Sequence, residues 1–307
     1  MHWHILGAGA IGCLWADFLT RTGQDVSLIL RNHSSLAHWA ENGPLEVYAG
    51  QNRHSVHCRL ETPDAEVPIG HLLVATKAYD TLTAMEAIQS RLAPEAEIVL
   101  LQNGMGQHEK VLQRLQQQRP KLRLWAATTT AGAWLENRQR LHCVSQGDTH
   151  IGPLTDHTPA LPSGWDQLDI PLHACADIAP LLWRKLAINC AINPLTVRFN
   201  CRNGALLETA ERIEMMQRVC REVEQVATAA GITLFPEPLE ERAAAVAQST
   251  GNNLSSMLQD IRNGRRSEIE QITGFLCQQA RALNIDVPVN HALLHAIRAM
   301  NPQDTDQ

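Results

Sequence analysis

Short apolar runs alternate with amphipathic stretches through the first half of the chain. The apolar runs have the length of buried strands, and residues with helical spacing follow most of them. This alternation predicts right-handed βαβ units in a mostly parallel sheet, and therefore an α/β fold. The main predicted strands lie at residues 2–6, 26–30, 71–76 and 97–101.

The remaining segments of this half are shorter or more polar. The predicted elements are a polar helix at residues 34–41, strand-like pieces at 45–49 and 55–60, a helix at 80–92, and a strand and hairpin over 124–152 with a turn near Glu136 and Asn137. Residues 153–171 are rich in Pro, Asp, Thr and Gly, which is typical of connecting and edge structure.

From about residue 175 the pattern changes to one helical stretch after another. Gly231 has the position of a helix stop, and Ser267 followed by Glu270 has the spacing of a capping box. The predicted helices lie at residues 178–192, 206–230, 238–248, 253–262, 267–283 and 290–299. This half of the chain is therefore predicted to be all-helical.

Three glycines, Gly7, Gly9 and Gly12, lie where the first strand gives way to a helix. In a dinucleotide-binding fold the first glycine allows a tight turn, the second lets a pyrophosphate approach the backbone, and the third lets the helix lie close to the sheet. The amides at the helix N-terminus then face the phosphates. An incidental glycine-rich turn is the alternative, but the order of strand, turn and helix favours a dinucleotide site.

These patterns divide the chain into two domains. We predict an N-terminal Rossmann-type dinucleotide-binding domain over residues 1–174 and a C-terminal all-helical domain over residues 175–307. Ligands of parallel sheets bind beyond the carboxyl ends of the strands, where the glycines, Arg31, Lys77 and Asn103 are all expected.

Arg31 ends the second strand about 20 residues after the glycines, where an NAD-specific fold has an acidic residue on the ribose. A guanidinium binds a 2′-phosphate through two donors, whereas a carboxylate would repel that phosphate. Arg31 therefore favours NADP over NAD. An ordinary surface arginine at a strand end is the alternative.

The composition of the 307 residues, 44% hydrophobic and 19% charged, is that of a globular enzyme. A net charge of −6 without a Lys/Arg cluster argues against nucleic-acid binding. We expect no membrane segment, because no apolar run approaches about 18 residues, and no signal peptide, because the start lacks a basic region. The eight cysteines include no CxxC pair and are expected to be reduced thiols of a cytoplasmic protein.

Fourteen histidines raise the question of a metal site. None of the close pairs has the spacing of a helix-borne HExxH motif or a zinc finger. We therefore expect surface histidines and no bound metal. The pairs considered are His2 and His4, His54 and His57, and His142 with Cys143.

The densest candidate chemistry lies in the predicted helix at residues 178–192. Lys185, Asn189 and Asn193 are spaced by four, so each is turned about 40° from the last and the three share one polar stripe. Asparagine is a poor helix former, which favours a binding role for the two amides. A solvated face, with Asn193 as a cap before Pro194, is the alternative.

Several motifs occur in a fixed order around this helix. They are Ala-Thr-Lys-Ala at 75–78, Gln-Asn-Gly-Met-Gly at 102–106, Thr-Thr-Thr at 128–130, Leu-Trp-Arg-Lys-Leu-Ala-Ile-Asn-Cys-Ala-Ile-Asn-Pro-Leu-Thr at 182–196, Asn-Cys-Arg-Asn-Gly at 200–204 and Asn-Leu-Ser-Ser-Met-Leu-Gln-Asp-Ile-Arg at 253–262, with Glu268 and Ile269. This set closely resembles the ketopantoate reductase (2-dehydropantoate 2-reductase) family. The resemblance covers nearly the whole chain and fades after about Pro288.

The resemblance implies NADPH-dependent reduction of 2-dehydropantoate to (R)-pantoate, a step of pantothenate and coenzyme A biosynthesis. It implies that Lys185 is the general acid, since a positioned ammonium stabilises charge on the carbonyl oxygen and delivers a proton. It also implies that Glu268 is a second catalytic residue, which lies near the lysine and the cofactor ribose. The implied substrate-binding residues are Asn189, Asn193, Asn203, Asn253 and Ser256, and the implied cofactor-binding residues are Gly7, Ala8, Gly9, Ala10, Ile11, Gly12, Arg31, Lys77, Asn103, Ala133 and Glu268.

Some features leave alternatives open. Asn263 and Gly264 interrupt the approach to Glu268, so no continuous helix leads up to it. A reductase of another branched 2-oxo acid would keep the same lysine and glycine turn, and a non-catalytic NADP-binding regulator would keep the turn alone. The expected partner is a small 2-oxo acid, and both a monomer and a homodimer are compatible with the sequence.

Overall fold

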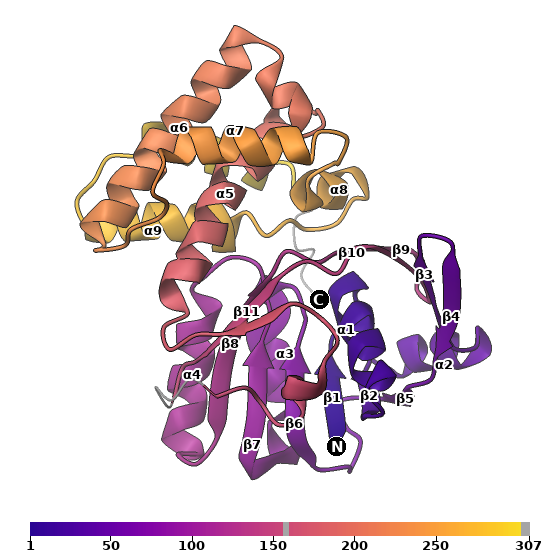
Figure 1. Ribbon diagram of the computed structural model, residues 1–307. Coiled ribbons are helices and arrows are strands. Elements are labelled where there is room, and N and C mark those ends of the chain that lie inside the picture. Colours follow the sequence, from indigo (N-terminus) through magenta and orange to yellow (C-terminus); the bar gives the residue numbers. More distant parts are fainter. Residues whose placement is uncertain (156–159, 302–307) are drawn as a thin grey trace. The chain divides into compact units, whose positions relative to one another are not determined.

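The computed structural model describes residues 1–155 and 160–301 and divides into two compact units, drawn in Figure 1. The first unit comprises Met1–Gln102 and Gln107–Ile178, and the second comprises Asn103–Gly106 and the chain from Ala179 onward. The first unit is α/β and the second is helical, so the predicted fold class is confirmed. Residues 156–159 of the predicted connection and 302–307 of the predicted helical domain lie outside the described residues.

An eight-stranded sheet forms the centre of the first unit, in the order β12-β11-β8-β7-β6-β1-β2-β5. All neighbouring strands are parallel except β8 and β11, which are antiparallel. The strands are β1 (His2–Leu6), β2 (Asp25–Ile29), β5 (Arg59–Glu61), β6 (Ile69–Val74), β7 (Leu92–Leu100), β8 (Arg123–Thr129), β11 (Thr149–Pro153) and β12 (Leu172–Ala174).

Helices cover both faces of this sheet, which explains why its central strands are apolar on both sides. Leu73 of β6 and Val99 of β7 belong to the core on the α1 face, whereas Leu72 and Ile98 belong to the core on the α3 and α4 face. The helices of the unit are α1 (Ala10–Arg21), α2 (His33–Glu41), α3 (Thr81–Ile88) and α4 (Gln107–Gln118).

The core beneath α1 is built on tryptophan rings. Trp15 of α1 stacks on Trp165 with ring centroids 4.4 Å apart, and Trp165 also lies 5.6 Å from Trp3 of β1. All three side chains are fully buried. Burial of rings of this size contributes strongly to core stability, so α1 is held firmly on the sheet.

A second, four-stranded sheet was not predicted. Its order is β4-β3-β10-β9, and it joins β3 and β4 to the hairpin of β9 and β10 through a parallel pairing of β3 with β10. The single strand predicted at 55–60 is wrong. His57 and Cys58 interrupt it, and the residues on either side belong to β4 and β5, which lie in different sheets. The strands are β3 (Leu45–Ala49), β4 (Asn52–Val56), β9 (Gly132–Asn137) and β10 (Arg140–Ser145).

In the second unit α5 is the central helix, and α6, α7, α8 and α10 all pack against it. Figure 1 shows α6, α7 and α8 around α5. The helices are α5 (Ala179–Arg198), α6 (Ala210–Ala229), α7 (Leu239–Ser249), α8 (Ser256–Arg262), α9 (Phe275–Ala282) and α10 (Pro288–Arg298), with a π-helical turn at Glu270–Gly274. None of the helices within the described ranges has the length and apolar character needed to cross a bilayer.

Two local predictions in this unit are wrong. The helix predicted to stop near residue 192 runs through Pro194 to Arg198, because packing on several sides buries this part of α5. Asn193 therefore lies inside the helix and is not a cap. The capping box also fails, since the buried Ser267 hydroxyl has no hydrogen-bond partner in the described structure and Glu270 instead accepts from Arg298.

Position 12 requires a glycine, because the first turn of α1 lies directly against the backbone of the glycine turn. A methyl group on Gly12 would lie 1.9 Å from the carbonyl oxygen of Gly7, which is rigid backbone. We expect Gly12→Ala to lower the free energy of unfolding by about 1 to 3 kcal/mol or more, measured by urea denaturation without ligand. Gly70→Ala is the control, because no described atom lies within 4 Å of a methyl group there. An equal loss in both variants would contradict the close-approach argument.

Candidate functional site

The ends of four strands lie side by side in the first unit. Leu6 pairs with Ile29 on β2 and with Val74 on β6, and Val74 pairs with Leu100 on β7. The glycine turn, Arg31 and Lys77 directly follow three of these strands, so the structure brings their backbones to one edge of the sheet. This is the edge at which parallel sheets bind their ligands.

The glycine turn leaves its backbone accessible. Gly7 turns the chain with φ of 107° and donates from its N–H to the carbonyl of Ile29 at 3.4 Å. Gly9 is the exposed N-cap of α1, and no described atom lies within 4 Å of a Cβ placed on it. Within the described residues no side chain caps the N-terminus of α1, so its first amides are available to an anion. The turn therefore fits the phosphates of a dinucleotide, and Ala8, Ala10 and Ile11 beside it are half-buried.

The other predicted cofactor residues of this unit differ in their surroundings. Arg31 is exposed just before α2, whose N-cap Asn32 accepts from the Ser35 amide at 2.9 Å. Lys77 is half-buried, and its carbonyl accepts from the Asp80 amide at 2.9 Å. Ala133 is half-buried in β9 of the second sheet, which packs against α1. Ala133 thus belongs to the second sheet, four residues after the end of β8.

Asn103 belongs to the helical unit although its sequence position follows β7. The Met105 amide donates to the carbonyl of Gln271 at 2.9 Å, which fixes the segment Asn103–Gly106 on the π-helical turn. Gly104 has φ of 77°, and a methyl group on it would lie 2.5 Å from the same carbonyl. The segment brings the Asn103 amide to the carboxylate of Glu268, with a donor-to-acceptor distance of 3.4 Å.

Lys185 lies on α5 and is only partly exposed. Burial lowers the pKa of Lys185 from its ordinary value of 10.5 to about 8, and the negative charge of Glu268 partly opposes that decrease. Glu268 is itself buried. A lysine with a pKa near neutrality, beside a carboxylate, can hold and release a proton under physiological conditions.

The two asparagines of the predicted stripe lie on the same helix as this lysine. Asn189 is partly exposed, whereas Asn193 is buried and its carbonyl accepts from the Thr196 hydroxyl at 2.7 Å. The stripe is therefore not the solvated face considered as its alternative.

Asn203 and Asn253 come together from separate loops. The backbone N–H of Asn203 donates to the backbone carbonyl of Asn253 at 3.0 Å. The side-chain Nδ2 of Asn203 donates to the Thr250 hydroxyl at 2.9 Å. Asn203 is 8% exposed, and its Oδ1 has no hydrogen-bond partner among the described residues. Asn253 is exposed. The structure therefore presents an unsatisfied amide oxygen at this junction.

Ser255 is a residue that sequence reasoning missed. It is buried, caps α8 by accepting from the Leu258 amide at 3.1 Å, and shares a 2.6 Å hydrogen bond with the Thr196 hydroxyl of α5. Ser256, the predicted substrate residue, is exposed in the first turn of α8. The cap motif of a serine before an apolar turn was visible in the sequence, but its partner on α5 was not.

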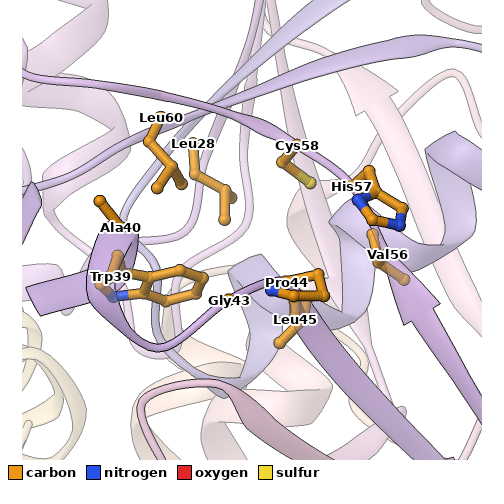
Figure 2. Close-up of a pocket in the computed structure, with 10 residues that line it drawn as sticks. All are labelled: Leu28, Trp39, Ala40, Gly43, Pro44, Leu45, Val56, His57, Cys58 and Leu60. Carbon is orange, nitrogen blue, oxygen red and sulfur yellow. The ribbon is translucent and has the colours of Figure 1, made fainter.

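Two other features of the first unit lie outside this set of residues. His4 was expected at the surface, but it is buried because Glu61, Arg91 and the strands on both sides surround it. A cavity of about 230 Å³ lies between α2, β2, β5 and the second sheet (Figure 2). No predicted site residue lines it. Its lining is Leu28, Trp39, Ala40, Gly43, Pro44, Leu45, Val56, His57, Cys58 and Leu60.

Two family models match the chain in sequence order. The model for "Ketopantoate reductase PanE/ApbA" matches residues 3–156, and that for "Ketopantoate reductase PanE/ApbA C terminal" matches residues 177–301. The chain belongs to the ketopantoate reductase family. The resemblance inferred from the motifs is thereby confirmed.

Relatives of known name cover nearly the same length. A 2-dehydropantoate 2-reductase from Escherichia coli O157:H7 is 36% identical over 297 residues, which are 96% of this chain and 93% of that protein. A ketopantoate reductase structure from Ralstonia eutropha JMP134 has a TM-score of 0.87 at 28% identity and covers 98% of both chains. A ternary structure of D-mandelate dehydrogenase with NADH and anilino(oxo)acetate, at 22% identity, 98% coverage of both chains and a TM-score of 0.84, shares the fold.

Ser255 is buried and Ser256 beside it is exposed, so substitutions of the two should affect stability differently. Ser255→Ala removes the α8 cap and leaves the Thr196 hydroxyl without its partner, so we expect the free energy of unfolding to fall by about 1 to 3 kcal/mol. Ser256→Ala, one position further, should change it by less than about 0.5 kcal/mol. Chemical denaturation of both variants measures the difference. Equal stabilities would show that the Ser255 contacts contribute nothing.

Proposed function

We propose that this protein reduces 2-dehydropantoate to (R)-pantoate with NADPH, in pantothenate and coenzyme A biosynthesis. The observation that carries the proposal is Lys185, whose pKa burial lowers to about 8 beside the carboxylate of Glu268. The name of the relative that is 36% identical over 96% of the chain supports the choice of substrate.

Lys185 acts as the general acid of the proposed reaction. NADPH, when bound, supplies the hydride that reduces the C2 carbonyl of the substrate. As negative charge develops on the carbonyl oxygen, the Lys185 ammonium stabilises that oxygen and then transfers its proton to it. Glu268 is a positioning residue for this step, because its charge favours the protonated lysine.

The polar side chains of the helical unit bind the rest of the substrate. Asn189, Asn193 and Asn203 hold its hydroxyl and carbonyl groups, and the orphaned Oδ1 of Asn203 suits a hydroxyl donor. Asn253 and Ser256 are exposed and receive the carboxylate. Each amide or hydroxyl contributes a hydrogen bond that is lost when the substrate lacks the matching group.

The cofactor residues fall into three groups. The turn of Gly7, Ala8, Gly9, Ala10, Ile11 and Gly12 binds the pyrophosphate with its open backbone. Arg31 binds the 2′-phosphate with an exposed guanidinium at the end of β2. Lys77, Ala133, Asn103 and Glu268 are assigned to the remaining phosphate and ribose contacts from the family resemblance.

The direct test is NADPH oxidation followed at about 340 nm with 2-dehydropantoate as substrate, next to a panel of other branched 2-oxo acids. The proposal predicts the highest kcat/KM for 2-dehydropantoate. A higher value for another acid would support the alternative reductase, and NADPH binding without turnover of any acid would support a regulator.

We also propose a cytoplasmic location, with a monomer or a homodimer as the working unit. All eight cysteines are free thiols, and burial raises the pKa of several, among them Cys58 to about 12. Thiols kept protonated in this way are poor nucleophiles, which suits a protein without disulfides.

Cofactor choice is predicted to depend on Arg31. The charge-assisted hydrogen bonds to the 2′-phosphate are worth about 1.5 to 3 kcal/mol, so Arg31→Ala should weaken NADPH binding by about 10- to 150-fold. NADH lacks this phosphate, and its affinity should hardly change. Fluorescence titration with both cofactors measures the ratio. Equal losses would show that Arg31 has only a structural role.

Turnover is predicted to depend on Lys185. Lys185→Ala should lower kcat by about 10² to 10⁴ while the protein remains folded and binds NADPH. Arg184→Ala is the matched control, since the arginine is turned about 100° from the lysine on the same helix and lies off the polar stripe. If Arg184→Ala were the more damaging change, the proton donor would be another group.

A further inference from the structure

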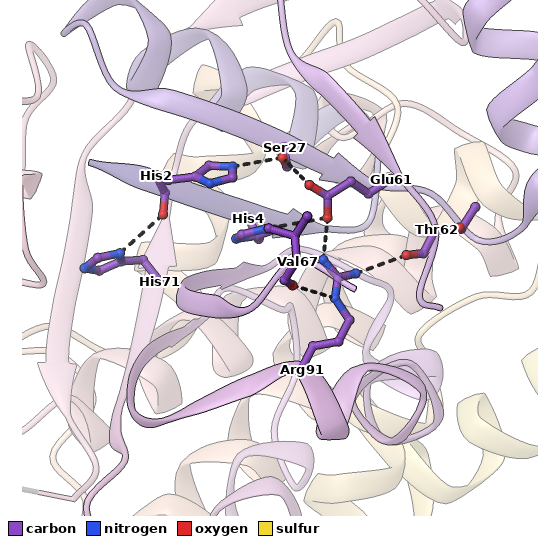
Figure 3. Close-up of polar contacts among 8 residues, drawn as sticks. All are labelled: His2, His4, Ser27, Glu61, Thr62, Val67, His71 and Arg91. Atoms are coloured by element: carbon purple, nitrogen blue, oxygen red, sulfur yellow. Dashed lines mark hydrogen bonds and ion pairs between the residues drawn. The ribbon is translucent and has the colours of Figure 1, made fainter. Parts of the chain in front are cut away.

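Three potential metal ligands meet on the first unit's sheet, away from the glycine turn. His2 and His4 are two residues apart on β1 and project to the same face, and Glu61 reaches them from β5 across β2 (Figure 3). One ligand atom from each of the three side chains lies within 4.8 Å of the others. The two imidazole rings have centroids 4.3 Å apart.

The two ring nitrogens of His4 lack hydrogen-bond partners in the described structure. The residue is 1% exposed, and neither Nδ1 nor Nε2 has a hydrogen-bond partner among the described residues. A neutral imidazole carries one donor and one acceptor, and burying both unpaired is costly. A ligand that accepts the ring's lone pair would remove part of this cost.

The separation of His4 from Glu61 suits a shared ion. His4 Nε2 lies 3.6 Å from Glu61 Oε2, which is too long for a hydrogen bond. Two ligands bound to Zn²⁺ at about 2.0 to 2.1 Å in a tetrahedral site lie about 3.4 Å apart. Only a small movement would therefore be needed for both atoms to bind one ion.

The groups around the three side chains orient them. The Ser27 hydroxyl donates to Glu61 Oε1 at 2.6 Å and accepts from His2 Nε2 at 2.9 Å. His2 Nε2 therefore carries the proton of the neutral imidazole, and a metal ion would bind at Nδ1 or take the place of the Ser27 contact at Nε2. Arg91 donates to Glu61 Oε2 and is itself fixed by the carbonyls of Thr62 and Val67, each at 3.0 Å.

Arg91 sets the strength of the site. Metal-binding carboxylates commonly accept further hydrogen bonds, so its guanidinium can remain on Glu61 when an ion binds. Its positive charge opposes a cation, however, and the affinity should be moderate. The ligand set of two imidazoles and one carboxylate favours Zn²⁺ and similar transition metals over Mg²⁺ or Ca²⁺.

We propose that His2, His4 and Glu61 form a site for one divalent transition-metal ion of the Zn²⁺ type. The ion links β1 to the edge strand β5 and stabilises this side of the sheet. The site is separate from the glycine turn at the opposite end of β1, and it is independent of the proposed reaction. The proposal differs from the expectation, drawn from sequence spacing, that these histidines bind no metal.

The test uses the untagged full chain after chelator treatment, with Zn²⁺ titrated by calorimetry and Co²⁺ as a spectroscopic probe. We expect one ion per chain, ligand-field bands of Co²⁺ bound by nitrogen and oxygen ligands, and a rise in Tm of roughly 5 °C at saturating Zn²⁺. His2→Gln should weaken binding at least about tenfold, since it removes one of three ligands from a half-buried position.

The matched control is His33→Gln. His33 is 74% exposed and pairs with Asp64, away from the three proposed ligands, so its loss should leave metal binding unchanged. Glu61→Gln, which retains an oxygen for Arg91, should weaken binding as His2→Gln does. The proposal is wrong if the wild-type chain takes up no Zn²⁺, if His2→Gln binds as tightly as the wild type, or if His33→Gln weakens binding equally.

Discussion

The burial of the Lys185 ammonium beside a carboxylate is the constraint on which the helical unit depends. A buried ammonium destabilises a fold unless an opposite charge lies near it, so Glu268 must stay in place. Glu268 precedes a π-helical turn, and the same turn accepts the Met105 amide through Gln271. Asn103 then donates to Glu268. These two hydrogen bonds attach the segment Asn103–Gly106 to the helical unit next to Glu268, and π-helical turns are frequent at functional sites.

The first unit satisfies a different requirement, an exposed backbone at the end of an otherwise buried strand. Core packing on both faces of the sheet fixes β1, and Gly12 lets α1 begin directly against the turn. The amides of α1 then remain uncapped and open at Gly9. The two units thus supply separate parts of the proposed chemistry, an anion-binding turn in one and a tuned proton donor in the other.

The sequence predicted those features that local periodicity and spacing determine. The parallel strands, the glycine turn and most helices follow from such patterns, and the family resemblance was carried by contiguous motifs. The features that it missed depend on partners distant in the chain. The second sheet pairs β3 with β10, and Ser255 bonds to Thr196 from 59 positions away. His4 is buried by Glu61 of β5 and by Arg91 of the 3-10 turn Gln89–Arg91. A proline inside a helix usually kinks or ends it. Helix α5 nevertheless continues through Pro194, because the helices packed around it bury this part.

The most direct test of the account is the pH dependence of kcat/KM for 2-dehydropantoate reduction. A general acid works while it is protonated, so activity should be constant below the Lys185 pKa of about 8 and fall as the pH rises through it. Because Glu268 raises this pKa, Glu268→Gln should move the midpoint to lower pH. A profile that stays flat from about pH 7 to 10, or a midpoint unmoved in Glu268→Gln, would contradict the account.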